Sequence, residues 1–242
     1  MGLAFRVDVD NPFGRSNKIM RLLNLLSHNY GIVPRMESIG FLRDANMLKD
    51  FFHDHKVPVT WFFRNATLPS KKSIGRFRLY RGEVNLHAEN TFNLSSFTNE
   101  VRKWEARAGL KVTGFTKHGS GELKLSRMHD PRYDPESLVD FGKTLGLKYF
   151  IGNSTDLTQM FVDYDGFTYI PSIYWLDRIE LHKDYPIEDL IRDADEINAV
   201  VLIHPIWFKL RKDLREQLRI LVESVSFEPL SSVISKGVKD GA

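Results

Sequence analysis

Three short apolar segments of this 242-residue chain end in side chains that bind metals or transfer protons. They are residues 3–10 (Leu-Ala-Phe-Arg-Val-Asp-Val-Asp), 83–87 (Glu-Val-Asn-Leu-His) and 200–204 (Val-Val-Leu-Ile-His). The side chains in question are Asp8, Asp10, His87 and His204. Two carboxylates and two imidazoles are the groups that a hydrolytic metal site needs, provided that the fold brings the segment ends together.

Alternating strands and helices would bring them together. The spacing of apolar residues and the turn residues between them predict strands over Leu3–Asp10, Val57–Phe63, Glu83–His87, Lys111–Phe115, Lys148–Ile151, Phe167–Ile173 and Ala199–His204. Helices are predicted over Lys18–Tyr30, Phe41–His55, Ser95–Ala108, Asp134–Gly146, Tyr185–Ile197 and Lys209–Val222. This order predicts an α/β fold with a mainly parallel sheet or barrel of about seven strands, whose active site lies at the carboxyl ends of the strands.

Asp8 and Asp10 lie two residues apart in a predicted strand, so their side chains point to the same side, as does that of Arg6. Two carboxylates in an apolar strand are costly to bury without partners, and a metal or an ion-pair network would offset that cost. The alternative is a strand end whose solvated acids cap the turn at Asn11-Pro12. We favour a functional site, because like charges that are held together usually mark one.

Histidines end two of the strands, and a third follows another. Glu89 shares the face of His87 if that strand continues. Pro205 forces an extended exit after His204 and holds its imidazole at the rim, although a core histidine is the alternative there. His118 lies beside two glycines that allow a ligand to approach the backbone, which makes it a further candidate.

Length and composition limit the class of protein. With 42% hydrophobic and 27% charged residues, we expect one globular domain over residues 1–242. The apolar runs are far shorter than the roughly 20 residues of a membrane span, so no membrane association is expected. The first residues lead directly into a strand without the pattern of a signal peptide, which predicts a cytoplasmic protein. The absence of cysteine excludes disulfides and thiolate–zinc sites.

The net charge of +3 is spread over most of the chain, with one exception. Residues 71–81 (Lys-Lys-Ser-Ile-Gly-Arg-Phe-Arg-Leu-Tyr-Arg) hold five cations and no acid. This basic segment is interpreted as a solvated loop or as a lid over an anionic sugar or phosphate. A nucleic-acid partner is not expected, because the sequence has no second basic region.

From Phe5 to about Phe208 the sequence resembles a divergent member of the polysaccharide deacetylase family (NodB-like, carbohydrate esterase family four). Residues 7–10 resemble a spaced variant of the first motif, which supplies a base and a metal-binding aspartate. The other resembling segments are residues 59–63 (Val-Thr-Trp-Phe-Phe), 84–87 (start of the His-x-x-x-His metal motif), 114–115 (start of the Gly-Phe-Arg motif) and 201–205 (the last motif, with the general-acid histidine).

The resemblance implies a distorted (β/α) barrel and a metal-dependent hydrolase that removes an acetyl group from an N-acetylated sugar or a related small amide. It implies a divalent metal, with zinc expected, held by Asp10 and His87. Asp8 would be the general base, and His204 would protonate the departing amine.

Two positions depart from the family pattern. The second metal-binding histidine of the motif would stand at residue 91, which is threonine, and the arginine would stand at residue 116, also threonine. A zinc site normally has three protein ligands, so Glu89, Asn90 or His118 would have to complete it. Lys117 could replace the arginine, and either Arg6 or Lys117 could orient Asp8. The alternative is a catalytically degenerate relative that binds a carbohydrate or a nucleotide sugar.

Overall fold

The computed structural model describes residues 1–10, 19, 22, 41–119 and 129–240. The predicted turn at Asn11-Pro12 lies outside these residues, as does nearly all of the predicted helix over residues 18–30.

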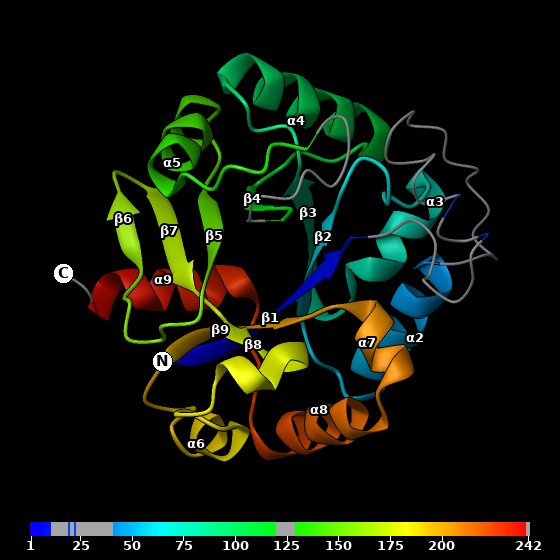
Figure 1. Cartoon of the computed structure of the whole chain (residues 1–242), viewed down its shortest axis with the longest axis vertical. Helices are drawn as coiled ribbons and strands as arrows, with labels where there is room; N and C mark the ends of the chain where they lie inside the picture. Colours follow the sequence, from blue (N-terminus) through cyan, green and yellow to red (C-terminus); the bar gives the residue numbers. More distant parts are fainter. Residues whose placement is uncertain (11–18, 20–21, 23–40, 120–128, 241–242) are drawn as a thin grey trace.

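The described residues form one nine-stranded sheet with the order β6-β7-β5-β4-β3-β2-β1-β9-β8 (Figure 1). The strands are β1 (Gly2–Val9), β2 (Val59–Phe63), β3 (Glu83–Ala88), β4 (Gly114–Lys117), β5 (Tyr149–Ser154), β6 (Val162–Tyr164), β7 (Phe167–Ser172), β8 (Tyr174–Trp175) and β9 (Asn198–Ile203). All neighbouring strands are parallel except β6, which runs antiparallel to β7. The predicted α/β fold with mainly parallel strands is confirmed.

Helices surround the curled sheet (Figure 1). They are α2 (Phe41–Asp54), α3 (Lys71–Ile74), α4 (Leu94–Ala108), α5 (Pro135–Thr144), α6 (Ile187–Arg192), α7 (Pro205–Leu210), α8 (Lys212–Ser224) and α9 (Leu230–Asp240), with 3₁₀ turns η1 (Gly75–Phe77), η2 (Leu79–Arg81) and η3 (Leu176–Leu181). Among these helices, none combines the length and the apolar composition that a membrane-spanning helix requires.

The sheet forms a half-barrel whose two edges come from one short stretch of chain. β7 pairs with β5 on one side, and β8 pairs with β9 on the other. Only Ile173 separates β7 from β8, and its backbone N–H donates to the carbonyl oxygen of Ser154 at 2.8 Å. The seven predicted strands correspond to β1–β5, β7 and β9. The sequence does not reveal β6 and β8, because strands of two or three residues are too short to show periodicity.

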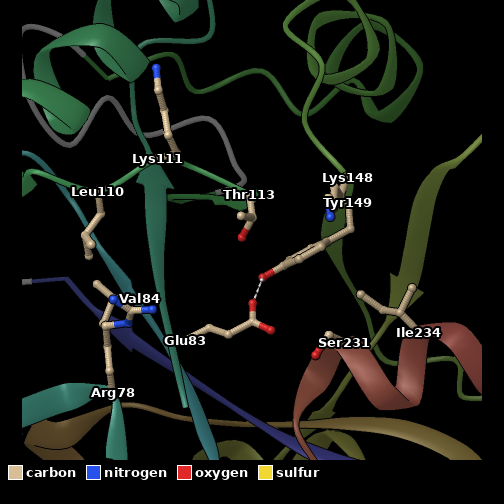
Figure 2. Close-up of a pocket in the computed structure, with 10 residues that line it drawn as sticks. All are labelled: Arg78, Glu83, Val84, Leu110, Lys111, Thr113, Lys148, Tyr149, Ser231 and Ile234. Carbon is tan, nitrogen blue, oxygen red and sulfur yellow. Dashed lines mark hydrogen bonds between the residues drawn. The ribbon is translucent and has the colours of Figure 1, made fainter. Parts of the chain in front are cut away.

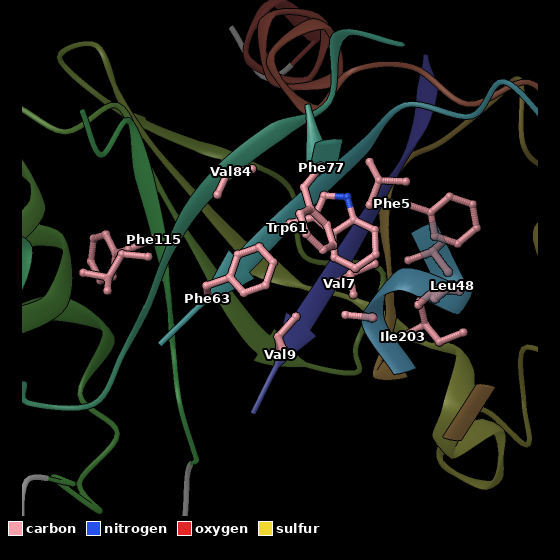
Figure 3. Packing of buried hydrophobic residues seen from close by; sticks show 14 of the residues in the cluster. Phe5, Val7, Val9, Leu48, Trp61, Phe63, Phe77, Val84, Phe115 and Ile203 are labelled. Atoms are coloured by element: carbon pink, nitrogen blue, oxygen red, sulfur yellow. The ribbon is translucent and has the colours of Figure 1, made fainter. Parts of the chain in front are cut away.

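Side-chain alternation divides the buried residues into an outer and an inner layer. On the outer face of β1, Phe5 and Val7 pack with Leu48 of α2 and Trp61 of β2 (Figure 3). Odd-numbered residues of β1 therefore face the helices, and the even-numbered residues face the interior of the half-barrel.

The interior of the half-barrel contains an apolar cluster, and charged and imidazole groups lie near the carboxyl ends of the strands. Ala4, Phe62 and Leu202 form the inner apolar cluster with Leu230 and Val233 of α9. Farther along the same strands, the inward positions are occupied by charged and imidazole groups. The polar end of the interior is therefore where a reaction site can form.

The predicted strand Lys111–Phe115 begins later in the structure, at the first residue of β4. The backbone N–H of Val112 donates to Glu105 Oε1 at 3.1 Å, and that of Thr113 donates to Asn85 Oδ1 at 3.0 Å. These amides bond to side chains where a strand would bond to its neighbour, so the parallel pairing starts only at Gly114.

Three other segments differ from the sequence predictions. The predicted helix Lys209–Val222 is divided into α7 and α8 by Arg211, whose backbone is extended (φ −111°, ψ 114°). The last helix, α9, was not predicted, and the helix predicted over Tyr185–Ile197 is limited to α6. The basic segment 71–81 folds into the short turns α3, η1 and η2.

Candidate functional site

Three candidate metal ligands converge at the carboxyl ends of β1, β3 and β4. Asp10 follows β1, His87 lies in β3, and His118 follows β4. Asp10 Oδ1 lies 3.0 Å from His87 Nε2 and 3.1 Å from His118 Nδ1, and the two nitrogen atoms are 3.1 Å apart. Among the described residues, these three form the one group with the spacing of a metal site.

Hydrogen bonding and burial prepare the two imidazoles for this role. His87 Nδ1 lies 2.6 Å from Thr116 Oγ1, which fixes the ring and leaves Nε2 directed at Asp10. Burial, followed by the charge of Arg64, lowers the pKa of His118 to about 4, so this ring is neutral at physiological pH. Burial alone would raise the pKa of Asp10, but His118 and His204 hold it well below its usual range.

The donor set fits a small divalent metal. One carboxylate oxygen and two imidazole nitrogens are typical zinc ligands, and three protein ligands leave a position for water or substrate. A tetrahedral site with metal–ligand bonds of about 2.0–2.1 Å separates adjacent ligand atoms by roughly 3.3 Å. The observed separations of 3.0–3.1 Å are close to this value. The Asp10 side chain is 28% exposed, so the set is open on one side.

Asp8 lies beside the three ligands and is held by Arg6. Arg6 Nε donates to Asp8 Oδ1 at 3.0 Å, and Nη2 donates to Asp8 Oδ2 at 2.6 Å. The guanidinium also donates to the carbonyl oxygen of Gly152 at 2.8 Å and to Asn153 Oδ1 at 3.0 Å. Burial opposes ionisation of Asp8, but Arg6 and then His87 lower its pKa overall. Asp8 is therefore a fixed, ionised carboxylate, 3.7 Å from His87 Nδ1.

His204 lies on another side of Asp10, and Asp177 orients it. The His204 backbone N–H and ring Nδ1 both lie 2.7 Å from Asp177 Oδ2, which makes Nδ1 the donor. Ring Nε2 lies 3.5 Å from Asp10 Oδ2. Burial would lower the pKa of His204, but Asp177 and Asp10 raise it to about 9. His204 is therefore protonated at neutral pH.

Asp177 and Arg64 are two residues of the site that sequence reasoning missed. Asp177 lies in η3, where no periodic pattern indicates that its side chain points inward. Arg64 follows β2, and its guanidinium donates to the Asp10 carbonyl oxygen and to Glu89 Oε1. The only sequence signal for Arg64 is its place directly after a predicted strand.

Glu89 shares the inward face of His87, as expected, but it lies outside the group of three ligands. Its carboxylate pairs with Arg64, and its backbone N–H donates to the carboxylate of Glu100 in α4. Burial, together with the close charge of Glu89, raises the pKa of Glu100 to about 7. Glu89 thus belongs to the network that supports the Asp10 backbone.

Lys117 points away from the site, because alternation along β4 directs it to the face opposite Thr116. Its ammonium is buried and donates to the carbonyl oxygens of Gly119 at 2.8 Å and of Asp130 at 2.6 Å. The sequence interpretation of Lys117 as a partner of Asp8 therefore has no support in this geometry. Lys117 instead links Gly119 and Asp130, which flank residues 120–128.

Both departures from the family pattern are compensated in space. Thr91 occupies the position of the missing histidine, and His118, directly after the neighbouring strand β4, brings the second imidazole to Asp10. Thr116 occupies the position of the missing arginine, and Arg6 of β1 supplies a guanidinium to Asp8. Of the residues that the sequence left open, His118 lies beside Asp10 and Arg6 lies beside Asp8.

No protein-family model and no curated protein sequence matches this chain. Solved structures do resemble it. The structure named Puue allantoinase aligns with a TM-score of 0.62 and 13% identity over 97% of this chain and 89% of that one. A probable polysaccharide deacetylase from Pseudomonas aeruginosa PAO1 aligns with a TM-score of 0.62 and 12% identity over 97% of this chain and 89% of that one. The chain therefore has the NodB-like half-barrel fold found in polysaccharide deacetylases.

Proposed function

We propose that this protein is a metal-dependent hydrolase that removes an acetyl group from an N-acetylated sugar or a related small amide. The observation that carries the proposal is the placement of Asp8 and His204 beside Asp10, His87 and His118. An ionised carboxylate and a protonated imidazole thus flank a donor set that fits a divalent metal, with zinc expected. The fold shared with a probable polysaccharide deacetylase supports the substrate class.

The chain's own residues would supply the acid and the base. A bound divalent metal would polarise the acetyl carbonyl and make water more acidic. Asp8, held by Arg6, would accept a proton as water adds to the carbonyl carbon. His204, held by Asp177, would donate its proton to the amide nitrogen as the C–N bond breaks. The products would be acetate and the free amine.

The alternative of a degenerate carbohydrate-binding relative is less well supported. It rested on the absence of a histidine at residue 91 and of an arginine at residue 116. His118 and Arg6 provide the same chemical groups at the site. A binding protein would have no need of a buried Asp8 or of a histidine kept protonated by Asp177.

We also propose a cytoplasmic location, with which the absence of cysteine is consistent.

Acetate release tests the proposed function directly. We expect the zinc-loaded protein to release acetate from N-acetylated mono- and oligosaccharides, to lose this activity after chelation and to recover it when zinc is restored. Enzymatic quantification of acetate measures the reaction, and the Asp8→Asn variant is the control for contaminating hydrolases. Failure of the metal-loaded protein to release acetate from any member of such a panel would contradict the proposal.

Replacing Asp177 with asparagine is expected to narrow the pH range of activity from its alkaline side. His204 must carry a proton to act as an acid, and the charge of Asp177 raises the pKa at which it loses that proton. Without this charge the pKa falls, so activity should be lost at a lower pH than in the wild type. The measurement is kcat as a function of pH. Asp213→Asn is the control, because Asp213 is exposed and pairs with the nearby Arg211. Superimposable profiles for Asp177→Asn and the wild type would contradict this role.

A further inference from the structure

A cavity lies at the opposite end of the half-barrel from the candidate site. It has a volume of about 500 Å³ and lies at the amino ends of β3, β4 and β5, beside α9 (Figure 2). Glu83 begins β3, and His87 lies four residues farther along the same strand. At roughly 3.3 Å per residue, Glu83 and His87 are about 13 Å apart along β3. The cavity is therefore separate from the Asp10 site.

The basic segment 71–81 contributes to this cavity. It immediately precedes β3, which places it at the amino end of the sheet, away from Asp10. It therefore does not cover the candidate metal site. Arg78 of this segment lines the cavity, together with Lys111 and Lys148 from the segments that lead into β4 and β5.

These cations exceed the acidic groups of the cavity. Among the described residues that line the cavity, Glu83 is the one acidic residue. Lys111 is paired with Glu105, at 2.9 Å. In the part of the chain that the structure describes, no carboxylate forms an ion pair with Arg78 or Lys148. Two cations thus remain available to an anionic ligand, and a concave surface strengthens their combined field.

The remainder of the lining is suited to the body of a small molecule. Val84, Leu110 and Ile234 provide apolar surface. Tyr149 Oη donates to Glu83 Oε2 at 3.0 Å, which leaves the second carboxylate oxygen of Glu83 as an acceptor for ligand hydroxyl groups (Figure 2). A cavity of this size would hold roughly 17 water molecules at about 30 Å³ each, so a phosphate ion alone would not fill it.

We propose that this cavity binds a small phosphorylated molecule that carries a hydroxylated ring, such as a sugar phosphate or a nucleoside monophosphate. Arg78 and Lys148 line opposite sides of the cavity (Figure 2), and their charges attract the phosphate, because guanidinium and ammonium groups form charge-assisted hydrogen bonds with phosphate oxygens. The ring covers Val84, Leu110 and Ile234, and its hydroxyl groups donate to Glu83. The site is a binding site distinct from the proposed hydrolase site.

Isothermal titration calorimetry of the full chain tests this site with glucose 6-phosphate, adenosine 5′-monophosphate and inorganic phosphate. We expect saturable 1:1 binding of at least one organic phosphate, more tightly than inorganic phosphate. Arg78→Ala and Lys148→Ala should each weaken that binding about tenfold or more, the usual effect of losing a charge-assisted hydrogen bond. Lys72→Ala is the matched control, since it removes a charge from the same segment outside the cavity and should leave binding unchanged.

His87→Ala separates this site from the candidate metal site. Binding of the organic phosphate should persist in that variant, whatever its effect on metal content or acetate release. The proposal would be overturned by the absence of saturable binding with all three probes at millimolar concentrations. It would also be overturned if binding survived the combined Arg78→Ala/Lys148→Ala change or disappeared in His87→Ala.

Discussion

Replacement of Asp8 with asparagine is expected to lower kcat by about 10²–10⁴-fold, the usual contribution of a general base, while the metal content stays near that of the wild type. Asparagine has the same shape but cannot accept the proton of the attacking water. The metal content should persist because the proposed ligands are Asp10, His87 and His118, without Asp8. The measurements are steady-state acetate release and elemental analysis of the same preparation.

The buried partner of Asp8 determines the controls for this experiment. Arg6 is 1% exposed and would lose its ion pair in the variant, so thermal unfolding must first show that the variant is folded. Asp163→Asn, an exposed change in β6, is the matched control and should leave kcat unchanged. Simultaneous loss of metal and activity would instead identify Asp8 as a ligand, and wild-type turnover would exclude it as the base.

Replacement of His87 with alanine is expected to remove nearly all of the metal from protein purified without added metal, and to abolish acetate release. The change leaves Asp10 and His118 as the ligands, fewer than the three protein groups that zinc sites normally have. Elemental analysis of the wild type and the variant measures the effect. His53→Ala is the control, because His53 lies on α2 and its side chain is half exposed.

The outcomes for His87 separate the two functional interpretations. A folded His87→Ala variant with the metal content of the wild type would show that the ion binds elsewhere. Wild-type protein without metal, even after incubation with excess zinc, would contradict the hydrolase proposal and would favour the carbohydrate-binding alternative. Neither result would affect the proposed phosphate site at Arg78, which is tested by a different measurement.

The sequence was sufficient to predict the strands and the end of the sheet at which the site lies. The seven longer strands show apolar runs bounded by turn residues, and parallel strands place their carboxyl ends together. Such runs are followed by Asp8, Asp10, His87 and His204. The sequence therefore predicts that these side chains lie at one rim of the sheet, without any knowledge of tertiary contacts. Alternation also correctly placed Arg6, Asp8 and Asp10 on one face, because that rule depends only on local backbone geometry.

The candidate ligand set and the partners of Asp8 and His204 depended on tertiary structure. His118 and Lys117 are adjacent, and which of them faces the interior depends on the register of β4. That register begins at Gly114, where an added Cβ would lie 2.2 Å from the ring of Tyr149. Tyr149 follows Gly114 by 35 residues, so no local pattern contains this constraint.

The same reason applies to Asp177 and Arg64. Asp177 reaches His204 across 27 residues, and Arg64 reaches Glu89 across 25. Local backbone preferences determine where a strand begins and which residues share its face, and these are visible in the sequence. The pairing of charged side chains from different elements depends on how the elements pack, and only the folded chain determines it.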